Sequence, residues 1–312
     1  MKSKDGIIGL LVGDALGVPF EFEPREEFIE NPVTDMVEYR VHNQPLGTWS
    51  DDGSLTLATL ESLTHGLDYE DILSNFVSWF MESKFSATDT VFDIGIGTRR
   101  AILKFQEGEE PLLAGGIDSH NNGNGSLMRI LPLAYYIKDL NLPIDEWVPI
   151  VHNVSSLTHR HKRSQIACGI YISIALKLLN NHGYSLEDII KNGVDEIAQY
   201  YKNNEEYKEE FETYFNRIIS GEIYNLPSEE IISSGYVIAT LEASIWCLVN
   251  TNSYKEAVLK AVNLGHDTDT TAAVTGGLAG IYYGYDNIPK DWVENIQKLD
   301  YVLDLCEKFD NR

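Results

Sequence analysis

Carboxylate and hydroxyl side chains gather in one short stretch of the chain, GHDTDTT at residues 265–271. A run of small residues follows over 272–280, which predicts a closely packed central helix. Carboxylates are favoured at a helix N-terminus by the helix dipole and the unpaired N–H groups. Asp267 alone could be an N-cap. With Asp269 and several hydroxyls beside it, the stretch also suits a hard cation such as Mg²⁺, Mn²⁺ or Ca²⁺.

A second cluster of the same kind lies far upstream, in GTWSDDGS at residues 47–54. Ser50, Asp51 and Asp52 again precede an apolar run with helical spacing, over 55–63. Each cluster on its own could serve only as a helix cap. If the two helix ends meet, however, the clusters would complete one oxygen-rich pocket.

Two further carboxylates lie in apolar surroundings. Glu21 stands between Phe20 and Phe22, and apolar neighbours tend to raise the pKa of a carboxyl group into the range of a general acid or base. The alternative is a surface glutamate in a loop. Asp93 is expected at the apolar start of a helix over 90–105, where capping alone would explain it.

A loop rich in glycine and asparagine, HNNGNGS at residues 120–126, leads into a helix expected over 126–138. Backbone N–H groups of such a loop can bind a phosphate, and glycine permits the close approach. The spacing matches neither a Walker loop nor the dinucleotide-binding fingerprint. A tight connection between helices is the alternative.

Two other segments could contact a ligand. His159 or His161 could bind a phosphate or ribose oxygen, although both could instead be capping or surface residues. Tyr236, at the entry to an apolar helix, could stack on a base or be an ordinary core tyrosine.

The elements that must position these residues are helical almost throughout. Helical periodicity is seen over 6–16, 51–65, 69–82, 145–156, 160–180, 185–200, 205–219, 234–250, 253–262, 268–283 and 290–309. Residues 18–49 are irregular, with a short β-segment expected near 36–41. Strand–helix alternation and linkers are absent from the pattern, so a single compact all-α domain over 1–312 is expected.

Composition limits the partners. The 312 residues include 48 acidic and 24 basic ones, a formal net charge of −24, which would repel nucleic acid and anionic membranes. Three scattered cysteines fit a reducing compartment, and no uninterrupted apolar stretch is long enough to span a bilayer. A cytoplasmic, monomeric protein is expected.

Taken in order, these motifs resemble the ADP-ribosylglycohydrolase family, which includes the dinitrogenase-reductase-activating glycohydrolase and the hydrolases of arginine-linked and serine-linked ADP-ribose. The resemblance covers residues 6–284 and rests on GDALG followed by Glu21, on SDD, DIG, the Asn/Gly loop, LTH, GY and DTDT. It implies an all-α fold with two divalent cations, Mg²⁺ or Mn²⁺, in a central cleft. The implied metal ligands are Ser50, Asp51, Asp52, Asp267, Asp269 and Thr270.

The resemblance also implies roles for the other residues. The loop residues Asn122, Gly123, Asn124, Gly125 and Ser126 would hold the diphosphate. His159 would line the cleft, Tyr236 would face the adenine and Asp93 would lie near the distal ribose. Family members often have threonine where this chain has Ser50 and Gly53; Ser50 keeps a hydroxyl, and no role is carried over to Gly53.

The implied reaction is metal-dependent hydrolysis of the bond between ADP-ribose and a protein side chain, with Glu21, Asp52 or Asp267 as acid or base. The loop looks most like that of the arginine-directed members. Serine-linked ADP-ribose, O-acetyl-ADP-ribose and a nucleic-acid adduct are alternative substrates, and the acidity disfavours the last.

Other functional classes remain open. DTDTT also matches the DxDxT motif of haloacid-dehalogenase-type phosphatases, but that motif must end a buried strand and none is expected here. His266-Asp267 is similar to part of the metal site of HD phosphohydrolases, without convincingly placed partners. A non-catalytic ADP-ribose-binding or structural relative would have lost its acidic ligands, whereas both clusters are intact.

Overall fold

The computed structural model describes residues 2–181 and 183–312; Met1 and His182, which the single-domain prediction includes, lie outside the described residues. No strand is assigned within these two ranges, only isolated bridges, so the all-α prediction is confirmed. The helices are α1 (Ser3–Gly17), α2 (Arg25–Glu30), α3 (Asp51–Leu63), α4 (Tyr69–Glu82), α5 (Ile96–Gln106), α6 (Pro132–Leu140), α7 (Ile144–Ser156), α8 (Lys162–Leu179), α9 (Leu186–Lys202), α10 (Lys208–Tyr214), α11 (Asn216–Ile219), α12 (Val237–Val249), α13 (Tyr254–Val262), α14 (Thr268–Tyr283), α15 (Lys290–Asn295) and α16 (Leu299–Asp310).

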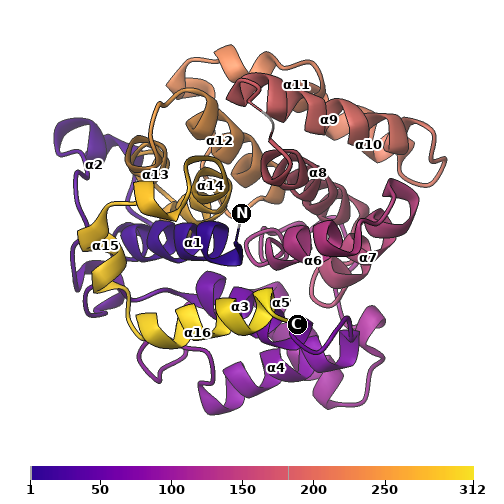
Figure 1. Ribbon diagram of the computed structural model, residues 1–312, viewed down its shortest axis with the longest axis horizontal. Coiled ribbons are helices and arrows are strands. Elements are labelled where there is room, and N and C mark those ends of the chain that lie inside the picture. The colour runs from indigo at the N-terminus through magenta and orange to yellow at the C-terminus, as the bar shows by residue number, and fades with distance from the viewer. Residues whose placement is uncertain (1, 182) are drawn as a thin grey trace.

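Helices α1 and α14 form the centre of the molecule, with the other helices arranged around them (Figure 1). They cross so closely that a Cβ on Gly13 would lie 2.1 Å from the backbone oxygen of Ala272. A Cβ on Gly9 would lie 2.4 Å from the oxygen of Gly276. The small-residue run after Asp269 therefore forms the closely packed helix that the sequence predicts, and glycine on both helices permits the contact.

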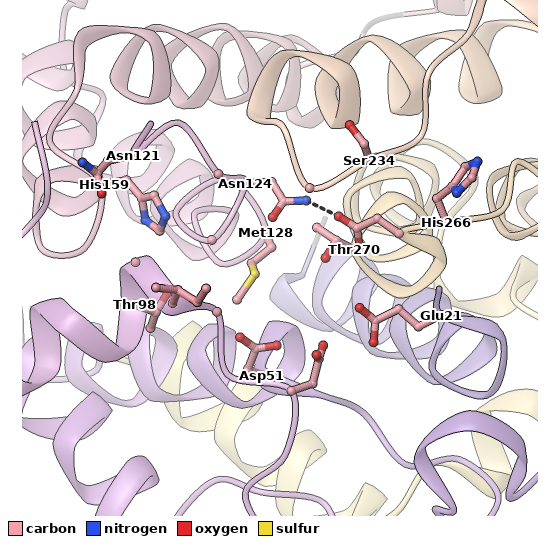
Figure 2. Close-up of a pocket in the computed structure, with 18 of the residues that line it drawn as sticks. Glu21, Asp51, Thr98, Asn121, Asn124, Met128, His159, Ser234, His266 and Thr270 are labelled. Atoms are coloured by element: carbon pink, nitrogen blue, oxygen red, sulfur yellow. Dashed lines mark hydrogen bonds between the residues drawn. The ribbon is translucent and has the colours of Figure 1, made fainter. Parts of the chain in front are cut away.

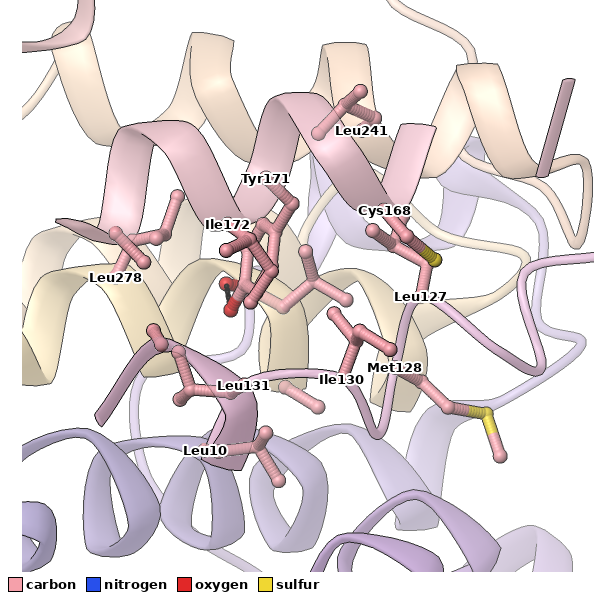
Figure 3. Close-up of a cluster of buried hydrophobic side chains, with 14 of the residues drawn as sticks. Leu10, Leu127, Met128, Ile130, Leu131, Cys168, Tyr171, Ile172, Leu241 and Leu278 are labelled. Carbon is pink, nitrogen blue, oxygen red and sulfur yellow. Dashed lines mark hydrogen bonds between the residues drawn. The ribbon is translucent and has the colours of Figure 1, made fainter. Parts of the chain in front are cut away.

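An apolar cluster packs between these central helices and α8 (Figure 3). Leu10 of α1, Leu131 and Tyr171 are almost completely buried, and the Tyr171 hydroxyl donates to the oxygen of Val274 at 3.1 Å. Because a buried phenol needs a hydrogen-bond partner, this bond fixes α8 against α14. Among the described residues, no helix is both long enough and apolar enough to cross a membrane.

Several helix boundaries differ from the prediction. The helix expected at 90–105 begins only at Ile96, because Asp89 and Asp93 have left-handed backbone angles, with φ of 55° and 54°. The helix expected at 126–138 begins at Pro132, a residue suited to the first turn of a helix. In place of the expected β-segment there is one bridge, between Tyr39 and Gln44.

Two helices expected to be continuous are interrupted. Residues 290–309 form α15 and α16, separated where Lys298 takes a φ of 48°. Residues 205–219 form α10 and α11, which meet at Phe215.

Candidate metal and ligand cleft

The cluster at 50–54 is held in place by a carboxylate of the central helix. Asp14, completely buried near the end of α1, accepts hydrogen bonds from the backbone nitrogen of Ser50 at 2.9 Å and from that of Gly53 at 2.8 Å. Burial raises the pKa of Asp14 to about 7. The Ser50 hydroxyl caps α3 by accepting from the nitrogen of Asp52. Sequence reasoning gave Asp14 no role, although a charged residue in an otherwise apolar helix was a usable signal.

The two acidic clusters meet, as the sequence analysis required for one pocket. The Thr270 hydroxyl donates to Asp52 Oδ2 at 3.4 Å across a sequence separation of 218 residues, and the Ser50 hydroxyl donates to the same oxygen at 3.3 Å. The helix starts of α3 and α14 therefore share one carboxylate oxygen. Asp267, for which an ordinary N-cap was the alternative, occupies the N-cap position of α14 but makes no side-chain capping bond.

Some of the buried carboxylate oxygens have no partner. Within the described residues, Asp52 Oδ1 and Asp269 Oδ2 are buried without a hydrogen bond. Burial, followed by repulsion from neighbouring carboxylates, raises the pKa of Asp51, Asp52 and Asp269 well above the usual value. A cation bound here would satisfy these oxygens and offset the desolvated charge. This set of carboxylate and hydroxyl oxygens fits a hard divalent ion.

Glu21 lies at the edge of the same acidic group and is only 5% exposed. One carboxylate oxygen from each of Glu21, Asp267 and Asp269 lies within 4.8 Å of the others. Backbone hydrogen bonds tie the Glu21 loop to the start of α14, because Phe22 donates to the oxygen of His266 at 2.6 Å. Burial and then the charge of Asp93 raise the pKa of Glu21 to about 10.

A cavity of about 900 Å³ opens above these groups. Figure 2 shows Glu21 and Asp51 facing Asn124 and Thr270 across it. Nine residues predicted for the site line it: Glu21, Asp51, Asp93, Gly123, Asn124, Gly125, His159, Asp267 and Thr270. Ser50, Asp52 and Asp269 are buried beneath it.

The Asn/Gly loop forms one wall of the cavity. The Asn124 side-chain amide donates to Asp267 Oδ2 at 2.7 Å, so this loop is joined directly to the acidic cluster (Figure 2). Asn122 and Ser126 face away from the cavity, where their side chains bond to Ser164 and Ser155. Turns follow the loop, and α6 starts only at Pro132, so the expectation that the loop opens a helix is wrong.

His159 lies against this loop. A Cβ on Gly125 would come within 2.8 Å of its ring, and one on Gly97 within 2.9 Å, so both glycines are needed for the contact. Burial lowers the pKa of His159 to about 3, which keeps the ring neutral. His161 instead caps α8 by accepting from the nitrogen of Arg163, as its capping alternative proposed.

Tyr236 lies outside the residues that line the cavity. Its side chain is 37% exposed, and its hydroxyl accepts a hydrogen bond from Arg163 at 3.1 Å. An isolated bridge joins it to Gly123, so it stands beside the loop.

Sequence reasoning missed part of the lining. Thr98 and Met128, which it did not single out, line the cavity, and so does His266, which it considered only as half of an HD pair (Figure 2). His266 has a φ of 60°, a backbone feature that the residue type alone does not reveal. The other residues missed are Phe22, Gly95, Ile96, Gly97, Arg100, Ile232, Ser233, Ser234 and Gly235, whereas His120 and Asn121 belong to the loop that the sequence analysis singled out.

Comparisons of the sequence and of the structure with known proteins point to the same family. A family model described as ADP-ribosylglycohydrolase matches residues 2–312. The chain is 31% identical over 309 residues to the ADP-ribosylarginine hydrolase Tri1 of Serratia proteamaculans, covering 98% of this chain and 78% of that protein. It is 28% identical over 314 residues to the ADP-ribosyl-(dinitrogen reductase) glycohydrolase of Rhodospirillum rubrum, covering 97% and 92% of the two chains. A solved structure described as an ADP-ribosylglycohydrolase-related protein complex superposes with a TM-score of 0.76 at 28% identity, over 99% of this chain and 97% of that one.

Proposed function

Because the chain belongs to the ADP-ribosylglycohydrolase family, a class of hydrolases that act on glycosidic bonds, we propose that it releases ADP-ribose from a modified arginine side chain. The observation that carries this proposal is the contact between the two acidic clusters through Thr270 and Asp52, directly beneath a cavity of about 900 Å³.

Arginine is favoured by two observations. Two relatives, from Serratia proteamaculans and Pseudomonas putida, are named as ADP-ribosylarginine hydrolases. In addition, carboxyl groups of Glu21, Asp51, Asp93 and Asp267 line the cavity. A cationic guanidinium group next to the scissile bond would be attracted to this side of the cleft.

Two divalent cations, Mg²⁺ or Mn²⁺, would be held by residues of the two acidic clusters: Ser50, Asp51, Asp52, Asp267, Asp269 and Thr270. Bound divalent ions would polarise the distal ribose hydroxyls and lower the pKa of a water molecule. The unpartnered oxygens of Asp52 and Asp269 support this assignment. Asp14 would keep the first cluster in register through its bonds to Ser50 and Gly53.

Glu21 is our choice for the acid or base. Asp52 and Asp267 belong to the proposed metal ligands, and they also accept hydrogen bonds from hydroxyls and from Asn124. Glu21 lies outside that ligand set and faces the cavity (Figure 2). In its ionised form, which bound cations beside it would favour, Glu21 would take a proton from the attacking water as the C1″–O bond forms and the bond between C1″ and the guanidine nitrogen breaks. Glu21 would then pass that proton to the departing nitrogen, which completes the hydrolysis.

The remaining residues would bind the ligand. Backbone N–H groups of Gly123 and Gly125 would hold the diphosphate, with Asn122 and Ser126 supporting the loop from behind and Asn124 joining it to Asp267. The neutral imidazole ring of His159 would face the diphosphate. Tyr236 would border the adenine at the outer rim, and Asp93 would lie near the distal ribose.

Two further proposals concern the cellular compartment and the oligomeric state. We propose a reducing compartment such as the cytoplasm, because Cys168, Cys247 and Cys306 are buried free thiols. We also propose that the protein acts as a monomer, which sedimentation analysis tests.

The experiment is release of free ADP-ribose from an arginine-ADP-ribosylated protein, compared with a serine-linked substrate and O-acetyl-ADP-ribose. Each substrate is tested with Mg²⁺, with Mn²⁺ and with chelator. Metal-dependent release from arginine alone supports the full proposal. Release only from another linkage would overturn the choice of arginine, and no release from any substrate would overturn the proposed activity.

A further inference from the structure

His42 lies beside Glu21 at the entrance to the acidic cleft. Its Nε2 is 2.5 Å from Glu21 Oε2, and its side chain is 14% exposed. Ligand atoms of Glu21, His42 and Asp93 lie within 4.8 Å of one another. His42 comes from a short 3₁₀ turn, η2 (Arg40–His42), in a part of the irregular segment 18–49 to which the sequence analysis gave no function.

The His42 ring is held by aromatic side chains. The ring centroid lies 5.9 Å from that of Phe22 and 5.2 Å from that of Phe92, both at tilted angles. Phe22 directly follows Glu21 and Phe92 directly precedes Asp93. The ring therefore lies between the residues that flank the two carboxylates.

The backbone of the turn is also held in place. Tyr39, Arg40 and Asn43 have left-handed φ values of 66°, 43° and 50°, a conformation that persists in such residues when the surroundings enforce it. Arg40 Nη2 lies 2.8 and 3.0 Å from the two carboxylate oxygens of Glu23, and its guanidinium lies 4.6 Å from the Phe20 ring centroid. Residues on both sides of Glu21 thus anchor the turn that carries His42.

This arrangement matters because the other ionisable neighbours of Glu21 are acidic. Charges on Asp93, Asp267 and Asp51 act on the Glu21 carboxyl group, so repulsion would favour side-chain conformations that turn it out of the cleft. In the Nε2–H tautomer the imidazole donates to Glu21 Oε2, and in the Nδ1–H tautomer a neutral Glu21 carboxyl group donates to Nε2. That hydrogen bond restrains one oxygen and leaves Oε1 available to a reactant.

We propose that His42 is a positioning residue, which holds the Glu21 carboxyl group in the cleft by the Nε2–Oε2 hydrogen bond while Phe22 and Phe92 fix the imidazole ring. The inference rests on the proposed function only in giving Glu21 the acid or base role. It assigns a functional role at the site to one residue of the segment 39–43.

Two substitutions separate the hydrogen bond from the packing. His42→Phe keeps an aromatic ring between Phe22 and Phe92 but removes the polar atom, whereas His42→Gln keeps a polar group that can bond to Glu21. His65→Phe is the matched control, since His65 is an exposed histidine at the end of α3. All variants are compared for thermal unfolding and for binding of free ADP-ribose.

We expect H42F to lower kcat about 100-fold, the scale of a misplaced catalytic group, with KM changed less than about 3-fold. H42Q should recover at least about 10-fold of that loss, and H65F should match the unsubstituted protein. Equal losses in H42F and H42Q, or a loss confined to KM, would overturn the positioning role. Unchanged kcat in H42F would overturn it as well.

A second measurement does not depend on activity. In protein labelled with ¹⁵N-histidine, the signal that disappears in H42F belongs to His42. The ¹⁵N chemical shift of its Nε2 should move in Glu21→Gln and stay fixed in Asp195→Asn, a variant on the exposed face of α9. An Nε2 shift unaffected by E21Q would contradict the contact itself, whereas a shift that moves in a protein lacking hydrolase activity would sustain the contact and reject only the proposed reaction.

Discussion

Asp269 contributes one of the buried carboxylate oxygens that lack a hydrogen-bond partner among the described residues. Asp269→Asn keeps the shape of the side chain and removes its charge. Because loss of a residue that only supports a metal ligand typically costs about 10–100-fold in affinity, loss of a ligand should lower Mn²⁺ affinity by at least about 100-fold. Calorimetric titration measures this, with Asp195→Asn on the exposed face of α9 as control. Unchanged Mn²⁺ affinity in D269N would show that the cluster is not a metal site.

Gly125 allows the close contact between the Asn/Gly loop and His159. In Gly125→Ala the new Cβ would lie 2.8 Å from His159 Cε1 and 2.9 Å from the Thr98 hydroxyl. Overpacking of this kind costs about 1–3 kcal/mol, so we expect ADP-ribose to bind roughly 10-fold more weakly. Asp195→Asn, on the exposed face of α9, is the control, and its affinity should not change. Equal dissociation constants for the two variants, measured by calorimetry, would reject this role for Gly125.

Helix prediction succeeded where packing and local signals agree. The helix bounds at 69–82 and 268–283 are those of α4 and α14. α4 has a capping aspartate, Asp68, and α14 a run of small residues. Prediction failed at Asp93, whose left-handed φ of 54° places it before α5 instead of within a helix. That conformation is set by the surroundings and not by residue type.

The crossing of α1 and α14 should tolerate no added side chain. In Gly13→Ala the Cβ would lie 2.1 Å from a backbone oxygen, and a backbone atom cannot move aside cheaply. We expect a loss of about 3 kcal/mol in the free energy of unfolding, measured by urea denaturation. Gly95→Ala is the control, because its nearest atom is 3.9 Å away and removing a glycine N-cap should cost less than about 1 kcal/mol. Similar midpoints for G13A and G95A would contradict the close crossing.

The packing of α7 on α9 should be sensitive to acid. His152 of α7 lies 2.9 Å from the Tyr201 hydroxyl of α9, and burial lowers the pKa of His152 to about 3. Below its ordinary pKa of 6.5, the unfolded chain binds a proton that the folded chain excludes. Falling pH therefore favours unfolding between about 6.5 and 3, by up to about 1.4 kcal/mol per pH unit.

His152→Gln removes this titration. We expect its unfolding free energy to depend less steeply on pH than that of the unsubstituted protein over the same range, as urea unfolding at pH 4–7 would show. Parallel pH dependences would mean that His152 is protonated in the folded state.

The cleft brings together segments from both ends of the chain. Asp14 and Asp52 come from α1 and α3, Thr270 comes from α14, and Asp267 directly precedes α14. Sequence analysis identified the two acidic clusters because closely spaced carboxylate and hydroxyl side chains indicate cation binding. It gave no role to Asp14 or His42, whose places depend on tertiary contacts such as the hydrogen bonds that Asp14 accepts from Ser50 and Gly53. The central crossing of α1 and α14 is what converts two separated motifs into one site.

The charge of the chain agrees with this arrangement. A net charge of −24 opposes the binding of an anion such as ADP-ribose. Bound cations together with loop N–H groups would offset that repulsion locally, while the rest of the surface stays acidic. The same charge favours release of a negatively charged product once the bond is broken.

The most direct test of one metal-dependent centre is a titration of metal-free protein with Mn²⁺, following bound metal and ADP-ribose release from an arginine-linked substrate in the same samples. The account predicts no release in chelator and full release only when about two equivalents are bound, by analogy with two-metal sites. Full release of ADP-ribose in chelator, or a rate of release that does not depend on the amount of bound metal, would contradict it.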